Sequence, residues 1–256
     1  MKGHLYDAAG NRILWLDARD GRSEPEYNQS RIAGFELSRR FELGQDLTAV
    51  LFGSAESQHA LFWNADGSYE MMCGNALRCL AHFICTDPFP HDLVAVETQY
   101  ANYLSRKVDA THGSVIIPAR TVRVGTPERD GDLFVDVGTP HRIRLVKQEW
   151  LEHDLVDATS HCNGANAVNF DLVRKVAPFQ YRVRTFERGV GETSSCGTAA
   201  VSIVAALNVR AAPSLAPQPS DHLEFASGEQ LIVTYDPSGE SYEVAGRVAL
   251  LQDLSK

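Results

Sequence analysis

The sequence lacks long hydrophobic runs: no stretch of about 18 consecutive apolar residues, the length that spans a bilayer, occurs in the chain. Residues 1–7 do not form the apolar segment of a secretory signal peptide. Lysine and arginine are few, 24 against 33 aspartates and glutamates, so the formal net charge is −9. Binding to nucleic acid or to an anionic membrane needs clustered positive charge. We therefore expect neither partner, and we expect a cytoplasmic protein.

Sequence motifs for cofactors are missing as well. The five cysteines include no Cys-x-x-Cys pair, and His161-Cys162 alone is a weak metal signal. Gly189-Val190-Gly191 is too short for the glycine fingerprint of a dinucleotide site, and no glycine-rich phosphate loop with a lysine is present. An odd number of cysteines in a chain of this length is typical of reduced thiols rather than of a disulfide framework. We expect no metal and no cofactor.

The chain contains one internal repeat. Cys73-Gly74-Asn75-Ala76 and Cys196-Gly197-Thr198-Ala199 share Cys, Gly and Ala at matching positions. Each copy follows a turn and precedes an apolar stretch, 76–84 in the first and 198–207 in the second, which predicts a buried helix. Strand-like segments at 94–108 and 223–235 follow the two helices.

The repeat indicates a duplication, and the duplication predicts the architecture. We expect an α/β fold of the α+β type with two pseudo-symmetric domains, each with strands wrapped around one central helix. The boundary falls between residues 118 and 126, which gives domains of 1–118 and 119–246. A further helix is expected over 31–41, and strands over 13–17, 48–52, 60–64, 133–137, 143–146, 167–173 and 181–185.

The start of a helix leaves about four backbone N–H groups without an intrahelical partner and carries partial positive charge. A cysteine there is expected to have a pKa below the usual value of about 8.5, and the same N–H groups can bind a substrate carboxylate. Two such helix starts, facing each other across a cleft, would hold one carboxylate and place a sulfur on each face of its α-carbon. That is the geometry of a two-base stereoinversion, in which one thiolate removes the α-proton and the opposite thiol delivers one.

A cysteine among apolar residues is usually a small buried side chain, and we interpret Cys79, Cys85 and Cys162 in this way. The duplicated Cys-Gly turns favour a catalytic role for Cys73 and Cys196.

Four segments closely resemble the diaminopimelate epimerase family: Asn64-Ala65-Asp66-Gly67-Ser68, Met72-Cys73-Gly74-Asn75-Ala76-Leu77-Arg78-Cys79, Glu187-Arg188-Gly189-Val190-Gly191-Glu192-Thr193, and Ser195-Cys196-Gly197-Thr198. The resemblance implies two domains, each a curled, mostly antiparallel sheet around a central helix, with a C-terminal tail at about 247–256 that returns to the first domain. It also implies amino-acid epimerisation without pyridoxal phosphate, metal or nucleotide.

The resemblance further implies the residues of the site. Cys73 and Cys196 take the catalytic positions, and two more residues are expected to prime the thiols, His141 beside Cys73 and Glu187 beside Cys196. The positions that match substrate-binding residues are Asn11, Asn64, Gly74, Asn75, Thr139, Asn166, Arg188, Gly197 and Thr198.

Two departures from the family bear on the substrate. Thr139 stands where the family usually has asparagine. Where the family has Gly-Phe-Asp-Gln, this chain has Gly44-Gln45-Asp46-Leu47, so the glutamine at the fourth position is replaced by leucine. The leading hypothesis is epimerisation of LL-diaminopimelate to the meso form. One alternative is a racemase of another amino acid, such as histidine or a basic one, and another is a non-catalytic amino-acid-binding module. The partner is a small molecule in each case, and a homodimer is the one protein assembly we consider.

Overall fold

The computed structural model describes residues 2–19, 27–54, 57–85, 93–128, 131–163, 167–210, 219–238 and 240–255. The chain divides into two compact units. Unit 1 comprises Met1–Ile116 and Ala245–Lys256, and unit 2 comprises Ile117–Val244. The sequence-based bounds lie within a few residues of these. Among the described residues, no helix is long and apolar enough to cross a membrane.

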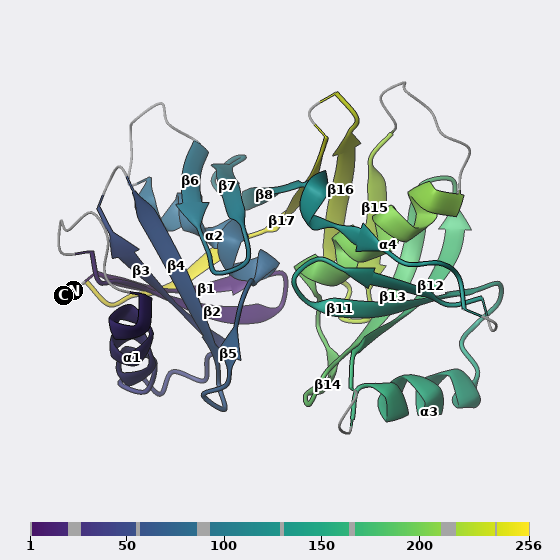
Figure 1. Ribbon diagram of the computed structural model, residues 1–256, viewed down its shortest axis with the longest axis horizontal. Coiled ribbons are helices and arrows are strands. Elements are labelled where there is room, and N and C mark those ends of the chain that lie inside the picture. The colour runs from purple at the N-terminus through teal and green to yellow at the C-terminus, as the bar shows by residue number, and fades with distance from the viewer. Residues whose placement is uncertain are drawn as a thin grey trace. The chain divides into compact units, whose positions relative to one another are not determined.

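Among its described residues, unit 1 contains two helices, eight whole strands and most of a ninth, β8 (Figure 1). In chain order the elements are β1 (Gly3–Ala8), β2 (Asn11–Asp17), α1 (Tyr27–Ser38), β3 (Leu47–Gly53), β4 (Gln58–Asn64), β5 (Tyr69–Glu70), α2 (Gly74–Ile84), β6 (Leu93–Glu97), β7 (Asn102–Lys107), β8 (His112–Pro118) and β18 (Ala249–Asp253). The strands pair in the order β18–β1–β2–β3–β4–β6–β7–β8, and β5 also pairs with β4.

Unit 2 repeats this plan. Its elements are the 3-10 helix η1 (Ala119–Thr121), β9 (Arg123–Val124), β10 (Leu133–Asp136), β11 (Pro140–Val146), α3 (Glu152–His161), β12 (Asn169–Ala177), β13 (Gln180–Glu187), β14 (Gly191–Thr193), α4 (Gly197–Arg210), β15 (Asp221–Phe225), β16 (Gln230–Asp236) and β17 (Ser241–Arg247). The strands pair in the order β9–β10–β11–β12–β13–β15–β16, and β14 also pairs with β13.

The two units match pair by pair. The parallel pairs β2–β3 and β4–β6 of unit 1 correspond to β11–β12 and β13–β15 of unit 2, and the other pairs named above are antiparallel. Helices α2 and α4 occupy the same place in the order, as do α1 and α3. The duplication inferred from the two Cys-Gly motifs is therefore confirmed, and each unit is a mostly antiparallel sheet that curls around one helix.

The central helices are rich in apolar residues, although Asn75, Arg78 and His82 give α2 one polar face. Nine of the eleven residues of α2 are buried, and the helix packs against β1, β2, β6 and β7. The α4 helix packs in the same manner against β9 to β12 and β16. A helix whose residues are buried on most sides needs strands around it, which explains the curled sheets. Both helices confirm the prediction from the sequence.

A second apolar layer lies on the outer face of each sheet. In unit 1, β2 is buried on both faces: Leu14 and Leu16 pack with Trp63 in the layer under α1, while Trp15 donates a hydrogen bond from Nε1 to the carbonyl of Ala76 in α2 (3.0 Å). In unit 2 the equivalent layer contains Phe170 and neighbours from α3.

Two predictions about helices need correction. The helix expected over 31–41 is α1, which begins and ends earlier, at Tyr27 and Ser38. No helix was expected over α3, which begins after Leu151, a residue with no side-chain acceptor. The carboxylate of Asp154 stabilises this start, because its Oδ2 accepts a hydrogen bond from the Leu151 N–H (2.9 Å).

Candidate active site

Cys73 lies at the N-terminal cap of α2. Its backbone is extended (φ −137°, ψ 109°), and its carbonyl accepts the first helical hydrogen bond, from the N–H of Leu77 (3.0 Å). The side chain is half-buried. The bond from Trp15 to Ala76 fixes this end of the helix to β2. The predicted position of Cys73, at a helix start inside a sheet, is therefore observed in unit 1.

Asn75, on the first turn of α2, contacts a buried arginine. Arg78 has no exposed surface, and its Nη2 donates to Oδ1 of Asn75 (2.7 Å) and to the carbonyl of Ala8 (3.4 Å). The amide oxygen of Asn75 therefore points at Arg78. The backbone N–H groups at this helix start are then the donors that suit a carboxylate.

Cys196 occupies the equivalent place in unit 2, directly before α4. Its carbonyl accepts a hydrogen bond from the N–H of Ala200 (3.1 Å). The side chain is 6% exposed, and Sγ lies 3.0 Å from Oγ1 of Thr198. The two cysteines that the repeat singled out thus precede corresponding helices in the two units.

The acidity predicted for a helix-start cysteine is wrong for Cys196. Burial raises the pKa of the Cys196 thiol well above its usual value, and the negative charges of Glu187 and Asp171 raise it further. The hydrogen bonds to Thr198 and to the Ala199 backbone act in the opposite direction but are weaker. Desolvation of a thiolate here outweighs the helix start, so Cys196 is a thiol at neutral pH.

The His141 side chain is fully buried in unit 2. Its Nδ1 lies 2.7 Å from Oδ2 of Asp171, and its Nε2 lies 2.9 Å from Oγ1 of Thr198. The resemblance assigned His141 to Cys73. Within unit 2 the contacts of the ring connect it, through Thr198, to Cys196, and its assignment to Cys73 remains a prediction.

Asn169 connects this histidine to the segment after β13. Its Nδ2 lies 3.3 Å from Nε2 of His141, and its Oδ1 accepts a hydrogen bond from the backbone N–H of Arg188 (2.8 Å). Neither Asn169 nor Asp171 was predicted. Their signal in the sequence was two polar residues at alternate positions of a strand whose other residues, such as Phe170, are buried. The predicted Asn166 lies outside the described residues.

Glu187 is the last residue of β13, and one of its carboxylate oxygens accepts a hydrogen bond from the Thr193 hydroxyl. Its charge is close enough to raise the pKa of Cys196. The resemblance assigns Glu187 to this neighbourhood, and its role in priming the thiol remains a prediction.

The other predicted substrate-binding residues lie at the ends of strands. Asn11 begins β2, Thr139 directly precedes β11, and Asn64 ends β4. The Asn64 amide already has partners, since Nδ2 donates to the Ser68 hydroxyl (2.9 Å) and to Oε1 of Glu70 (3.1 Å). A carboxylate therefore lies beside a residue that the resemblance assigns to the substrate.

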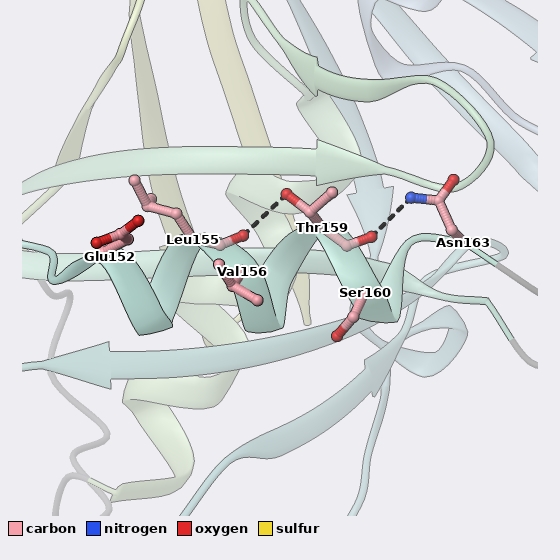
Figure 2. Close-up of a pocket in the computed structure, with 6 residues that line it drawn as sticks. All are labelled: Glu152, Leu155, Val156, Thr159, Ser160 and Asn163. Carbon is pink, nitrogen blue, oxygen red and sulfur yellow. Dashed lines mark hydrogen bonds between the residues drawn. The ribbon is translucent and has the colours of Figure 1, made fainter.

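An open hollow on the surface of α3 is a separate feature. Figure 2 shows its lining, in which Thr159 and Asn163 hydrogen-bond back onto the backbone of the helix. The lining residues are Glu152, Leu155, Val156, Thr159, Ser160 and Asn163. None of them was predicted to belong to the site. Within the described ranges, no group of three or more His, Cys, Asp and Glu side chains is arranged to hold a metal ion.

Comparison with known proteins gives consistent relatives. No family model matches the chain. The diaminopimelate epimerase of Streptomyces coelicolor is 30% identical over 204 residues, which cover 74% of this chain and 70% of that protein. The diaminopimelate epimerase of Xanthomonas campestris pv. campestris is 28% identical over 232 residues, 78% of each chain. Among solved structures, a hydroxyproline epimerase from Agrobacterium vitis superposes with a TM-score of 0.70 at 13% identity, covering 99% of this chain and 90% of that one.

Proposed function

Because the chain belongs to the diaminopimelate epimerase family of isomerases, we propose that it converts LL-diaminopimelate to the meso form, with Cys73 and Cys196 as paired acid and base. The observation that carries the proposal is the position of the two cysteines. Each immediately precedes the central helix of its unit, and the two units have the same strand order. A duplicated fold that keeps a thiol at the same point in both copies fits a reaction that needs two of them.

The chemistry follows from what these helix starts offer. The α-proton of an amino acid is weakly acidic, and its removal places negative charge on the α-carbon and the carboxylate. Backbone N–H groups at Gly74 and Gly197 are suited to hold that charge, because a helix start has donors that its own backbone does not use. One sulfur takes the proton as a thiolate, the other gives a proton as a thiol, and the configuration is inverted.

The protonation state of Cys196 determines which cysteine acts as the acid and which as the base in each direction of the reaction. Because burial keeps Cys196 a thiol at neutral pH, it is the proton donor when Cys73 abstracts. In the reverse direction Cys196 must first lose its proton. Both cysteines have to be reduced, and none of the five cysteines is part of a disulfide. A reducing compartment such as the cytoplasm therefore suits the reaction.

A racemase of an amino acid with a cationic side chain is the second candidate. The hydrogen bond between Asn64 and Glu70 favours it, since a carboxylate at that place attracts an ammonium or imidazolium group and repels a second carboxylate. Thr139, which stands where the family usually has asparagine, favours it as well.

Proton NMR in D2O tests both candidates. The reduced protein is mixed with LL-diaminopimelate, and in separate samples with L-histidine, L-lysine and L-arginine, and the loss of the α-proton signal is followed. Exchange confined to diaminopimelate supports the first candidate, and exchange confined to a basic amino acid supports the second. Exchange with none of them contradicts both. Chiral chromatography of the products checks that exchange is accompanied by inversion.

A further inference from the structure

We propose that the Thr198 hydroxyl relays a proton between Cys196 and His141, and that Asn169 and Asp171 hold the imidazole in the tautomer that this relay requires. The inference rests on the proposed function, because it explains how a buried thiol enters the reaction as a base. All of the residues lie in unit 2. Asn169 and Asp171 act as positioning residues, since they contact the imidazole and not the sulfur.

The tautomer of His141 follows from Asn169. The backbone N–H of Arg188 can only donate, so the atom of Asn169 that contacts it is the amide oxygen (2.8 Å). The other end of the amide is therefore the NH2 group, which lies 3.3 Å from Nε2 of His141 and can only donate. Nε2 must then be an acceptor, which means that it is not protonated.

The opposite side of the ring agrees with this assignment. A neutral imidazole carries its proton on one nitrogen, and the remaining nitrogen is Nδ1. Nδ1 lies 2.7 Å from Oδ2 of Asp171, an acceptor whose side chain has no exposed surface. A carboxylate on one side and an amide NH2 on the other thus specify the same tautomer independently.

The direction of the remaining hydrogen bonds is then determined. Because Nε2 accepts, the Thr198 hydroxyl must donate to it across 2.9 Å, and the one lone pair of Nε2 is shared between this bond and the longer one from Asn169. The hydroxyl has used its one proton, so its oxygen is an acceptor for the S–H of Cys196, which lies 3.0 Å away. Every bond in the chain from Cys196 to Asp171 points the same way, toward the carboxylate.

Proton transfer along this chain balances without another reactant. The S–H proton of Cys196 moves to Oγ1 of Thr198 as the hydroxyl proton moves to Nε2 of His141. The products are a thiolate and an imidazolium, and the carboxylate of Asp171 stabilises the imidazolium. The thiolate can now remove the α-proton of the substrate, which makes Cys196 a thiol again, while Cys73 gives a proton to the opposite face and becomes a thiolate. The extra proton on His141 then leaves to water and Cys73 takes up a proton from water, which restores the starting state.

The surroundings of Cys196 explain why a relay is needed. The charged groups near its sulfur are the carboxylates of Glu187 and Asp171, and both disfavour a thiolate. Moving the proton only as far as His141 places a positive charge within the same buried cluster. That charge offsets the carboxylates, whereas loss of the proton to water does not.

Two measurements on the protein without substrate test the relay. The first is long-range 1H–15N NMR of the His141 ring in the wild type, which distinguishes the two tautomers. We expect a protonated Nδ1 and an unprotonated Nε2. A ring with its proton on Nε2 would overturn the proposal, because the hydrogen bonds would then point toward Cys196.

The second measurement is the rate at which iodoacetamide alkylates Cys196, followed by peptide mass spectrometry. Thr198→Ser keeps the hydroxyl and Thr198→Val removes it at nearly the same volume. We expect the serine variant to stay close to the wild type and the valine variant to be slower by at least about tenfold. Equal rates in the two variants would contradict the relay.

Asp171→Asn distinguishes the relay from a purely electrostatic effect, because the two explanations predict opposite changes in the alkylation rate of Cys196. Removing a negative charge near Cys196 should make its thiolate easier to form and alkylation faster, if charge alone matters. The relay predicts slower alkylation, because the imidazolium loses its counter-charge. With an active substrate, kcat should fall by at least about tenfold while KM changes little. A protein that epimerises none of the amino acids tested would refute the proposed function and leave these substrate-free results to decide on the relay.

Discussion

Nδ1 of His141 lies 2.7 Å from Oδ2 of Asp171, and neither side chain has any exposed surface. The two residues lie on β11 and β12, which pair in parallel with His141 opposite Asn169. Asn169 and Asp171 are alternate residues of one strand, so their side chains lie on the same face of the sheet. The imidazole is therefore held from two sides by one rigid strand pair, and the α4 helix start presents Thr198 and Cys196 to it.

Replacement of either Cys73 or Cys196 by serine will slow α-proton exchange by at least about 100-fold. A serine hydroxyl is a far weaker acid and base than a thiol at neutral pH, while its size leaves the helix start intact. Proton NMR in D2O measures the exchange, and circular dichroism checks the fold.

Cys85→Ser is the matched control for the two thiol variants. Cys85 lies at the opposite end of α2, where its backbone N–H caps the helix. We expect exchange at the wild-type rate. A Cys73→Ser or Cys196→Ser variant that also keeps the wild-type rate would contradict the two-thiol mechanism.

Arg78→Lys will lower the free energy of unfolding by about 2–4 kcal/mol. The guanidinium of Arg78 is fully buried and donates to Asn75 and Ala8 with a geometry that an ammonium group cannot reproduce. Urea denaturation measures the change. Arg182→Lys is the control, because the Arg182 side chain is 52% exposed, and it should change the stability by less than about 0.5 kcal/mol. A similar cost for both variants would mean that the buried contacts of Arg78 contribute little.

Much of the fold was predictable because short stretches of sequence specify its central helices, and the same motif occurs in both units. The α2 and α4 helices begin at Gly74 and Gly197 and are apolar on most faces, so an apolar stretch after a Cys-Gly turn sufficed to find them. The α3 helix was missed because Leu151 precedes it, and its start depends on the carboxylate of Asp154.

The candidate site was predictable only in part, since it depends on contacts distant in sequence. Cys196 and Thr198 share a motif, whereas the association of His141 with Asp171 exists only because β11 and β12 pair in parallel. The direction of the pKa shift at Cys196 was predicted wrongly for a related reason. A motif indicates the helix start, but burial and the charge of Glu187 depend on the rest of the unit.

Asp221→Asn will stabilise the protein above pH 6 and not at pH 4. Partial burial raises the pKa of the Asp221 carboxyl to about 6, so the folded state favours the protonated form. Near pH 4 and below, the carboxyl is protonated in the folded state and ionisation carries little penalty. Above pH 6 the folded protein must hold a carboxylate there, and that penalty is fully present.

We expect Asp221→Asn to raise the free energy of unfolding at pH 8 by on the order of 1 kcal/mol, a modest value because water screens a partly exposed group. Urea denaturation at pH 4 and pH 8 measures the difference between the two conditions. Glu224→Gln, an exposed carboxylate on the same strand, is the control and should show no comparable gain. A gain of equal size at both pH values would refute the explanation by ionisation.

Gly113→Ala will weaken both the fold and the catalysis. A Cβ at Gly113, on β8, would lie 2.2 Å from the carbonyl oxygen of Arg78, which belongs to the backbone of α2 and cannot rotate away. Either β8 or α2 must shift, at a cost of about 1–3 kcal/mol. Because α2 carries Cys73 at its start, a displaced helix should also slow epimerisation. Gly125→Ala is the milder comparison, since its nearest neighbour, the Phe134 carbonyl oxygen, lies 3.3 Å away and needs to move by only a few tenths of an ångström, so a smaller loss of stability is expected. Unchanged stability of Gly113→Ala in urea, together with full activity, would show that the β8–α2 contact can relax without moving Cys73.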